Sequence, residues 1–528
     1  MIVMVHINNY GCKKHCFNMK TLRLILGDQL NIKHSWFKEP NDQVTYCLFE
    51  MRQETDDIKH HIQKVIGFFA AMRQFGEDLK TAGHKVIYFK INDANNTQDL
   101  IKNVSLLVTE LHIEQFEYMR PDNYRLDDQL KQYKATTSLN TQVFSTEHFY
   151  TRRNDLTIFF EGKKQFLMEN FYRNMRKKHD ILMTAGQPEG GKWNYDKSNR
   201  NKWKGDVPIP KYKAFNNEVS DVIKDIEEAD ITTIGTLKTS TFSYPITRKQ
   251  AIAQLKYFCE ELLVHFGDYQ DAMHTNEDYL FHSRLSFAMN LKLIGPKDIV
   301  NSVMNYYRAH SDAISISQVE GFVRQVIGWR EYMRGMYWSF MPDYKLKNAL
   351  DNHNTLADFF WTGDTKMNCL KHAITNSLDN GYAHHIQRLM ITGNYALLTQ
   401  TDPNQVDDWY LGVYVDAIEW VQLTNTRGMS QFADGGKIAT KPYVSSGSYI
   451  HKMSNYCGDC HYNKAKKTED DACPFNSLYW NFLDDKREQL GKNFRMRMMY
   501  NLLDKMDKTV LQDIKKKAHH IIENQNEY

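Results

Sequence analysis

Short apolar runs alternate with helical patterns over the first 150 residues of the chain. Runs rich in Leu, Ile, Val, Tyr and Phe are typical of buried strands, whereas apolar residues at helical spacing indicate amphipathic helices. Ile62, Val65, Ile66, Phe69 and Met72 recur in this way on one helical face. Strands that alternate with helices predict a parallel sheet. The predicted strands are residues 21–26, 44–49, 84–91 and 113–118, and the predicted helices are residues 56–82 and about 96–110.

The pattern changes beyond residue 150. Residues 150–180 are helical and basic, and the polar, Gly- and Pro-bearing stretch after them is typical of a linker. From about residue 245 onward, apolar residues recur at helical spacing almost throughout. We therefore predict an α/β domain with a parallel, Rossmann-like sheet, a connecting region, and a large all-α domain. The predicted boundaries are residues 1–18 for a tail, 19–150, 151–244 and 245–528.

Polar residues follow the first two predicted strands. Asp28 and Gln29 come directly after the first strand, and Glu54 follows the second. Ligands of parallel sheets bind at the carboxyl ends of the strands, so these side chains are candidates for a ligand site. The alternative is that they are ordinary turn and capping residues. The sequence has no GxGxxG or Walker motif, so neither a classical dinucleotide site nor an NTPase is indicated.

Composition and charge exclude few classes of protein. A net charge of +3 over 528 residues gives no general attraction to nucleic acid, which would need a local basic face. The stretch from Lys192 to Lys213 interleaves basic residues with Trp193, Tyr195 and Trp203. It fits either contact with a nucleic-acid backbone and its bases or a solvated connector. No apolar run of 18 residues, no signal peptide and only eight cysteines predict a cytoplasmic protein with no membrane span.

Four of the eight cysteines lie in the last third of the chain at spacings typical of metal ligands. Cys457 and Cys460 form a Cys-x-x-Cys pair, Cys473 precedes a proline, and Cys369 lies upstream. Four thiolates at such spacing suit a [4Fe–4S] cluster or a structural zinc. Cys-Pro at the last position and the distant fourth cysteine favour iron–sulfur, while His461 beside Cys460 leaves zinc open. Inert buried thiols are the third possibility.

Several segments together resemble the photolyase/cryptochrome family. The segment from His282 to Ser286 (HSRLS) is similar to the family's phosphate-gripping segment, and Gly328 to Tyr332 (GWREY) is similar to its Trp-Arg-Glu-Phe/Tyr segment. With the Gly-Asp-Gln-Leu opening, the GGKWNYD linker and the four cysteines, the chain resembles the iron–sulfur bacterial branch, the prokaryotic (6-4) photolyases. The resemblance implies FAD, a [4Fe–4S] cluster, a 6,7-dimethyl-8-ribityllumazine antenna, and light-driven repair of UV-damaged DNA. We also expect the protein to be a monomer.

The resemblance also assigns cofactor contacts. Ser283, Arg284, Leu285 and Ser286 would hold the FAD phosphates through cationic and hydroxyl groups. The α/β domain would be the antenna domain, with Asp28, Gln29 and Glu54 around the lumazine. Further candidates for FAD contacts are Tyr269, Glu320, Arg324, Arg330, Asp416 and Trp420.

The expected reaction needs a proton donor at the lesion. Histidine suits this role because its ordinary pKa is about 6.5. By the resemblance, His385 is the expected donor, with His384 beside it, and Tyr443 and Tyr449 contact the substrate. Trp361, Trp409 and Tyr410 would carry electrons between the flavin and the surface. Cys369, Cys457, Cys460 and Cys473 would bind the cluster.

Two other functions share part of this pattern. A cryptochrome-like blue-light photoreceptor would use the same flavin with little or no repair. An iron–sulfur nucleic-acid-binding protein would keep the four-cysteine site without photochemistry. Retention of His385, Tyr443 and Tyr449 favours repair over the photoreceptor.

Overall fold

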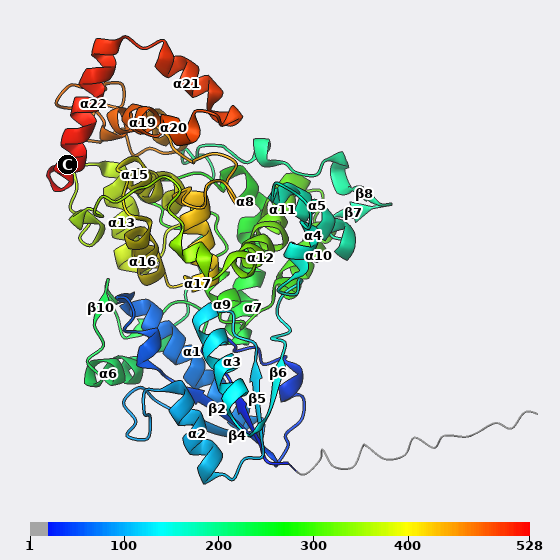
Figure 1. The fold of residues 1–528 in the computed structure, drawn as a ribbon. Coiled ribbons are helices and arrows are strands. Elements are labelled where there is room, and N and C mark those ends of the chain that lie inside the picture. Colours follow the sequence, from blue (N-terminus) through cyan, green and yellow to red (C-terminus); the bar gives the residue numbers. More distant parts are fainter. Residues whose placement is uncertain (1–18) are drawn as a thin grey trace, which may run out of the picture.

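The structure is a computed structural model that describes residues 19–528, and the predicted tail of residues 1–18 lies outside the described residues. The N-terminal lobe contains a five-stranded sheet, and the C-terminal lobe is built almost entirely of helices (Figure 1). All neighbouring strands of the sheet are parallel, in the order β4-β2-β1-β5-β6, which confirms the predicted fold class. The strands are β1 (Thr21–Leu24), β2 (Val44–Phe49), β4 (Lys85–Phe89), β5 (Gln115–Met119) and β6 (Asn140–Phe144).

Helices cover both faces of this sheet because successive strand side chains point to opposite faces. Leu22 and Leu24 of β1 pack with α2 and α3 on one face. Tyr46 and Leu48 of β2 lie on the other face with α1, in a core that continues into the helical domain. The covering helices are α1 (Ile62–Thr81), α2 (Leu100–Glu110) and α3 (Tyr124–Thr136).

The connecting region, residues 151–244, divides between the two lobes. Its first part packs on the helical domain, and its last part returns to the sheet domain, where β10 pairs with β3 and α6 packs on α1. Its elements are α4 (Asp155–Phe159), α5 (Met168–His179), β7 (Met183–Thr184), β8 (Gln187–Pro188), β9 (Asn217–Glu218), α6 (Ser220–Glu228), β10 (Thr233–Ile234) and β11 (Thr241–Phe242), and β3 is His60–His61.

Much of the basic and aromatic pattern of the connecting region is used within the fold. Arg176 is fully buried and donates to the carbonyl oxygens of Ile181 and Trp193. The Trp193 ring lies 5.3–5.5 Å from the cationic groups of Arg173, Arg176 and Lys177. These residues therefore stabilise the connecting region itself, although many of its other basic side chains are exposed.

The helical domain begins with α7, and its order confirms the predicted helical character from about residue 245 onward. No helix in residues 19–528 combines the length and apolarity needed to span a membrane. The helices are α7 (Arg248–Tyr257), α8 (Leu263–Tyr269), α9 (Ser286–Asn290), α10 (Pro296–Ala309), α11 (Ile316–Val323), α12 (Glu331–Phe340), α13 (Asn368–Asn380), α14 (His385–Gln387), α15 (Gly393–Leu398), α16 (Pro403–Val413), α17 (Glu419–Leu423), α18 (Gly447–Met453), α19 (Pro474–Asp485), α20 (Arg487–Leu490), α21 (Arg497–Asp504) and α22 (Lys508–Glu523).

Candidate cofactor cavities and four-cysteine centre

A cavity in the middle of the helical domain, called here the central cavity, collects many of the predicted site residues. Its walls come from the turn before α9, from the segment around α14 and from the residues that precede and follow α17. The predicted residues that line it are Ser283, Arg284, Leu285, Ser286, Arg330, His384, His385, Tyr410 and Asp416.

Asp416 connects three walls of the central cavity. Its carboxylate accepts a hydrogen bond from the Ser286 hydroxyl at 2.6 Å and from Arg388 Nη2 at 3.0 Å. Its backbone carbonyl accepts from the Asn290 amide at 2.5 Å, and Arg330 Nη1 donates to Asn290 Oδ1 at 2.5 Å. Ser286, which we expected at the cofactor phosphates, thus has its hydroxyl committed to Asp416.

Arg284 presents positive charge to the central cavity from a turn. Its backbone is in the left-handed region at φ 54°, which is uncommon for a residue with a side chain and concentrates at functional sites. Its guanidinium lies 4.2–4.7 Å from the ring centroids of Tyr212, Tyr244 and Tyr279. Within residues 19–528, its Nε and Nη2 atoms are buried without a hydrogen-bond partner. An anionic ligand would satisfy these donors.

Helix irregularities mark three walls of the central cavity. Arg324–Arg330 between α11 and α12, Arg388–Thr392 after α14, and Thr424–Ser430 after α17 are π-helical. Each of these segments contributes residues to the lining. Such π-helical turns are frequent at functional sites because the extra residue per turn redirects side chains.

His384 and His385 lie at the start of α14, where only one of them reaches open space. His384 is the N-cap residue and is 3% exposed, with its ring stacked on that of His282 at 4.6 Å. His385 is the first residue of the helix, and its side chain is exposed toward the cavity. The difference follows from the roughly 100° between adjacent residues of a helix.

The two histidines are neutral at pH 7 in this arrangement. Removal from bulk water by the surrounding protein and then the positive charge of Arg388 lower the pKa of His385 to about 4. Burial, followed by the neighbouring His282 and His385, lowers the pKa of His384 well below its ordinary value. From the sequence we expected a histidine that gives up a proton near neutral pH. His385 can do this only if a bound ligand raises its pKa.

Tyr443 and Tyr449 lie outside the cavity lining but close to Asp271, which belongs to it. Burial and then the charge of Asp271 raise the pKa of Tyr449 to about 12. Tyr443 lies in the loop before α18 and Tyr449 in α18 itself, and this loop is held on α15 because the Asn394 amide donates to the Ser445 carbonyl at 3.0 Å. Both hydroxyls remain protonated at pH 7 and can act as hydrogen-bond donors at this edge.

The structure places four of the expected flavin contacts away from the central cavity. The Tyr269 ring stacks on Phe281 at 5.4 Å. Glu320 is fully buried, bonds to Arg324 at 3.2 Å and accepts from the Tyr195 backbone N–H at 2.9 Å, so this pair holds the connecting region on α11. Trp420 lines a different cavity, between the lobes. The resemblance that suggested these four residues did not define which side of its element each one occupies.

Three aromatic residues join the central cavity to the surface. Tyr410 lines the cavity, and its ring is 5.2 Å from that of Trp409, which is fully buried. Trp409 Nε1 donates to the Phe360 carbonyl at 2.9 Å, and the next residue, Trp361, is 44% exposed. The order Tyr410, Trp409, Trp361 thus runs from inside to outside.

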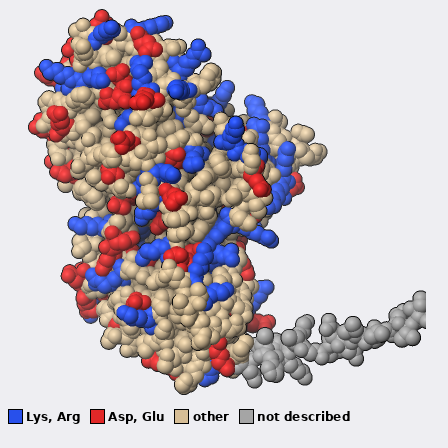
Figure 2. Space-filling model, viewed as in Figure 1, with Lys and Arg blue, Asp and Glu red and all other residues tan. Residues whose placement is uncertain are grey.

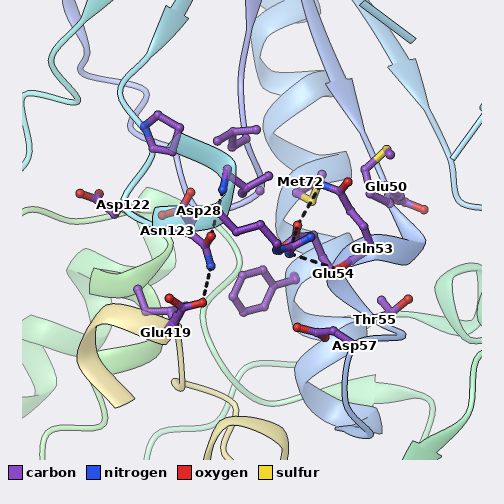
Figure 3. A pocket seen from close by; sticks show the side chains of 18 of the residues that line it. Asp28, Glu50, Gln53, Glu54, Thr55, Asp57, Met72, Asp122, Asn123 and Glu419 are labelled. Carbon is purple, nitrogen blue, oxygen red and sulfur yellow. Dashed lines mark hydrogen bonds and ion pairs between the residues drawn. The ribbon is translucent and has the colours of Figure 1, made fainter. Parts of the chain in front are cut away.

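A second cavity, called here the interdomain cavity, lies where the carboxyl ends of β1 and β2 meet α1 and the segment leading into α17. Asp28 and Glu54 line it, and Glu54 pairs with Arg125 at 2.7 Å (Figure 3). Asn123 donates to Glu419 of the helical domain at 3.0 Å across it. Gln29 is outside the lining: its amide bonds to the Leu26 N–H and the Met119 carbonyl, both at 3.1 Å, and holds the turn after β1 in place.

The four predicted ligand cysteines line one small cavity between α13, α18 and α19. Burial raises the pKa of Cys369 well above its ordinary value, and the other three cysteines add to the shift because they are close. The fold thus brings Cys369 together with three cysteines that lie 88 to 104 positions after it in the chain. Within the described residues, no group of three His, Cys, Asp or Glu side chains is arranged to hold a metal ion. Cys47 and Cys259 are buried elsewhere.

Comparison with known proteins identifies the family. A family model described as deoxyribodipyrimidine photo-lyase-related protein matches residues 23–242. The chain is 40% identical over 503 residues to a (6-4) photolyase of Agrobacterium fabrum, covering 95% of this chain and 98% of the relative. The chain belongs to the photolyase/cryptochrome family.

Solved structures of other members of the photolyase/cryptochrome family share the fold. A bacterial class III photolyase from Agrobacterium tumefaciens matches with a TM-score of 0.53 and 14% identity over 94% of this chain and 99% of that one. A cryptochrome from Synechocystis matches with a TM-score of 0.55 and 10% identity over 91% and 95%. The two-lobe arrangement is therefore that of the family.

Photolyase-family proteins carry flavin, and the central cavity fits FAD. The buried unpaired donors of Arg284 suit its phosphates, while Arg388 and Asp416 supply paired charge on another wall. Sequence reasoning gave no role to Arg388 or His282. Both were visible beside the predicted residues, since His282 directly precedes Ser283 and Arg388 lies three residues after His385.

Proposed function

We propose that this protein repairs (6-4) pyrimidine–pyrimidone photoproducts in DNA by a light-driven reaction, with FAD bound in the central cavity. The observation that carries the proposal is the position of His385, whose exposed side chain reaches the cavity while its neighbours are buried. The 40% identity to a (6-4) photolyase over nearly both chains supports the reaction type. A lesion flipped out of the duplex would reach this cavity at a cost of only a few kcal/mol, because a damaged base is already poorly stacked.

The residues of the chain bind and position the reactants. Reduced FAD, when bound, supplies the electron that light excitation delivers to the lesion. Arg284 and Ser283 would hold the cofactor phosphates, and Arg330 and Asp416 line the cavity that would contain the cofactor. His385 would donate a ring N–H to the lesion, and negative charge on a lesion that has accepted an electron would raise the pKa of His385 so that the proton can transfer. Tyr443 and Tyr449 would donate hydroxyl hydrogen bonds from the edge, and Tyr410, Trp409 and Trp361 would form the path by which electrons from the surface reduce an oxidised flavin.

Two further groups belong to the proposal. The four cysteines would hold a [4Fe–4S] cluster, which is supported by their convergence on one cavity and by the Cys473-Pro474 sequence. The interdomain cavity would hold a lumazine antenna such as 6,7-dimethyl-8-ribityllumazine. Its support is a mixed lining of Phe and Leu side chains with the carboxylates of Asp28 and Glu54.

Light-dependent repair tests the reaction directly. Reduced, flavin-loaded protein is mixed with one oligonucleotide that carries a (6-4) photoproduct and one that carries a cyclobutane dimer, and restored bases are scored by chromatography. Restoration of the (6-4) oligonucleotide only under blue light supports the proposal. Failure to restore either lesion while flavin is bound would contradict it and favour a photoreceptor.

A further inference from the structure

A strip of exposed apolar side chains crosses the 3₁₀ turn Phe494–Met496 and helix α21. Phe494 is 82% exposed, Met498 70% and Leu502 49%. Their spacing of four residues places them on one helical face. Exposed single apolar residues are ordinary, but three on one face of a short segment form a candidate contact surface.

Basic side chains alternate with this strip. Lys492, Arg495 and Arg497 are all exposed, and none of them belongs to an ion pair within residues 19–528. Figure 2 shows Lys and Arg side chains along the side of the molecule that runs from the region of α21 toward α5. Self-association through this strip is disfavoured, because the unpaired positive charges beside it would face the same charges on a second copy. It suits a polyanion that also offers flat apolar faces.

The strip is bonded to the segment that leads to Tyr443 and Tyr449, which lie close to the central cavity. The Asn493 amide donates to the Thr440 carbonyl at 3.0 Å, and Thr440 begins the segment that carries Tyr443 and Tyr449. Arg495 is near enough to Tyr443 for its positive charge to oppose the rise in the pKa of that tyrosine, which burial causes. Phe494 therefore lies between two residues that are tied to this segment, one by a hydrogen bond and one by its charge, and the segment carries the tyrosines proposed to contact the lesion.

From this placement we propose that Phe494 fills the gap left in the duplex when the lesion is flipped out, while Arg495 and Arg497 bind the phosphates next to it. Apolar side chains that insert between base steps are a known means of holding a kinked, unstacked duplex open. Met498 and Leu502 continue the apolar contact along the exposed base edges. This role rests on the proposed function, since it needs a flipped base in the central cavity.

The test compares binding of a lesion-bearing duplex with binding of the same lesion in a single strand. Full-length protein carrying Phe494→Ala is titrated by fluorescence anisotropy against both. We expect about a tenfold loss of affinity for the duplex, as for the removal of one stacking contact. Affinity for the single strand stays unchanged, because a single strand leaves no gap to fill. Phe494→Trp retains duplex affinity, and Leu346→Ala, which removes a side chain that is 81% exposed elsewhere, changes neither.

Each other outcome has a definite meaning. If Phe494→Ala binds the lesion duplex like the wild type, or loses affinity equally for both substrates, the gap-filling role is wrong while the proposed function stands. If the wild type itself neither prefers the lesion nor repairs it under light, the proposed function fails and this role fails with it. A concentration-dependent dimer that Phe494→Ala abolishes in sedimentation would assign the strip to a second copy and overturn the inference.

Discussion

The imidazole rings of His282 and His384 stack nearly parallel, with centroids 4.6 Å apart and planes 14° from one another. His384 caps the helix whose first residue is His385, and its backbone N–H donates to Gln387 Oε1 at 3.2 Å. The stack therefore holds the start of α14 from the side of the turn that carries Ser283 and Arg284. It connects the segment expected at the cofactor phosphates to the segment expected at the lesion.

Replacement of His282 tests this connection. His282→Ala removes one ring of the stack and leaves a gap beside His384, so we expect the quantum yield of repair to fall by about tenfold, equivalent to about 1.4 kcal/mol. His282→Phe keeps a flat ring and should retain most of the yield. Flavin content and lesion affinity are measured alongside. If His282→Phe lowers the repair yield as much as His282→Ala does, loss of the ring stack does not explain the lower yield.

Removal of His385 should separate binding from chemistry. His385→Ala leaves the walls of the cavity intact, because the side chain is exposed rather than packed. We expect normal folding and flavin binding, and a loss of repair of at least about a hundredfold, within the range for a lost general acid. His384→Ala serves as the comparison, since its ring is buried and its loss should also lower stability. Repair by the His385 variant at the normal rate would exclude it as the proton donor.

The pair formed by Arg388 and Asp416 should matter for stability as well as for cofactor binding. Their side chains are only 16% and 12% exposed, and Asp416 also accepts from Ser286. Asp416→Asn removes the negative charge and leaves the Arg388 guanidinium poorly compensated, so we expect the free energy of unfolding to fall by about 2–3 kcal/mol. Urea denaturation of apoprotein measures this. Adding Arg388→Gln should recover part of the loss, and strict additivity of the two changes would contradict a coupled pair.

The sequence predicted the fold well where burial produces a strong pattern. β2 has the predicted bounds, and β1, β4 and β5 differ from the predicted bounds by at most two residues at either end. The edge strand β6 was missed because its sequence, NTQVF, is polar and its side chains are mostly half exposed or exposed. Arg176, in a stretch that the sequence shows only as helical and basic, is buried because the segment after it supplies carbonyl oxygens to its guanidinium.

For the candidate sites too, the sequence predicted some residue positions correctly and others not, for physical reasons. Motifs of adjacent residues, such as Ser283 to Ser286 and His384-His385, were placed at the central cavity because local spacing fixes their relative positions. Glu320 and Trp420 were misplaced because residue type and helix position do not determine which neighbouring element each face meets. The pairing of Arg388 with Asp416 depends on contact across 28 residues, which one sequence cannot show.

Gly447 gives a test of the four-cysteine centre that leaves every thiol in place. A methyl group at this position would lie 3.0 Å from Cys473 Sγ and 3.4 Å from Asn476 Oδ1. Gly447→Ala should therefore displace Cys473 and lower the iron content of purified protein by at least about half, with loss of visible absorbance from the cluster. Ser448→Ala, at the exposed neighbouring position, should have no effect. Full iron occupancy in the Gly447 variant would contradict a cluster ligand at Cys473, and zinc in place of iron would identify the alternative metal.

The contacts of His61 lead us to expect that the protein loses stability in acid. Its Nε2 bonds to the Leu378 carbonyl at 2.8 Å, and its Nδ1 accepts from the Gln63 backbone N–H at 3.1 Å, so it caps α1 and connects that helix to the helical domain. This arrangement requires the neutral ring. Burial lowers the pKa of His61 to about 4, below the unfolded value of about 6.5.

Because the unfolded state binds the proton more readily, the stabilising effect is complete above about pH 6.5 and is lost as the pH falls toward 4. Urea denaturation at pH 7, 6 and 5 should show this decline. His61→Asn keeps a capping oxygen without a titrating group, so the slope of stability against pH should fall by up to about one proton. His60, His282 and His385 have lowered pKa values too and will leave a residual slope. An unchanged slope in the Asn variant would mean that His61 is not a source of the acid sensitivity.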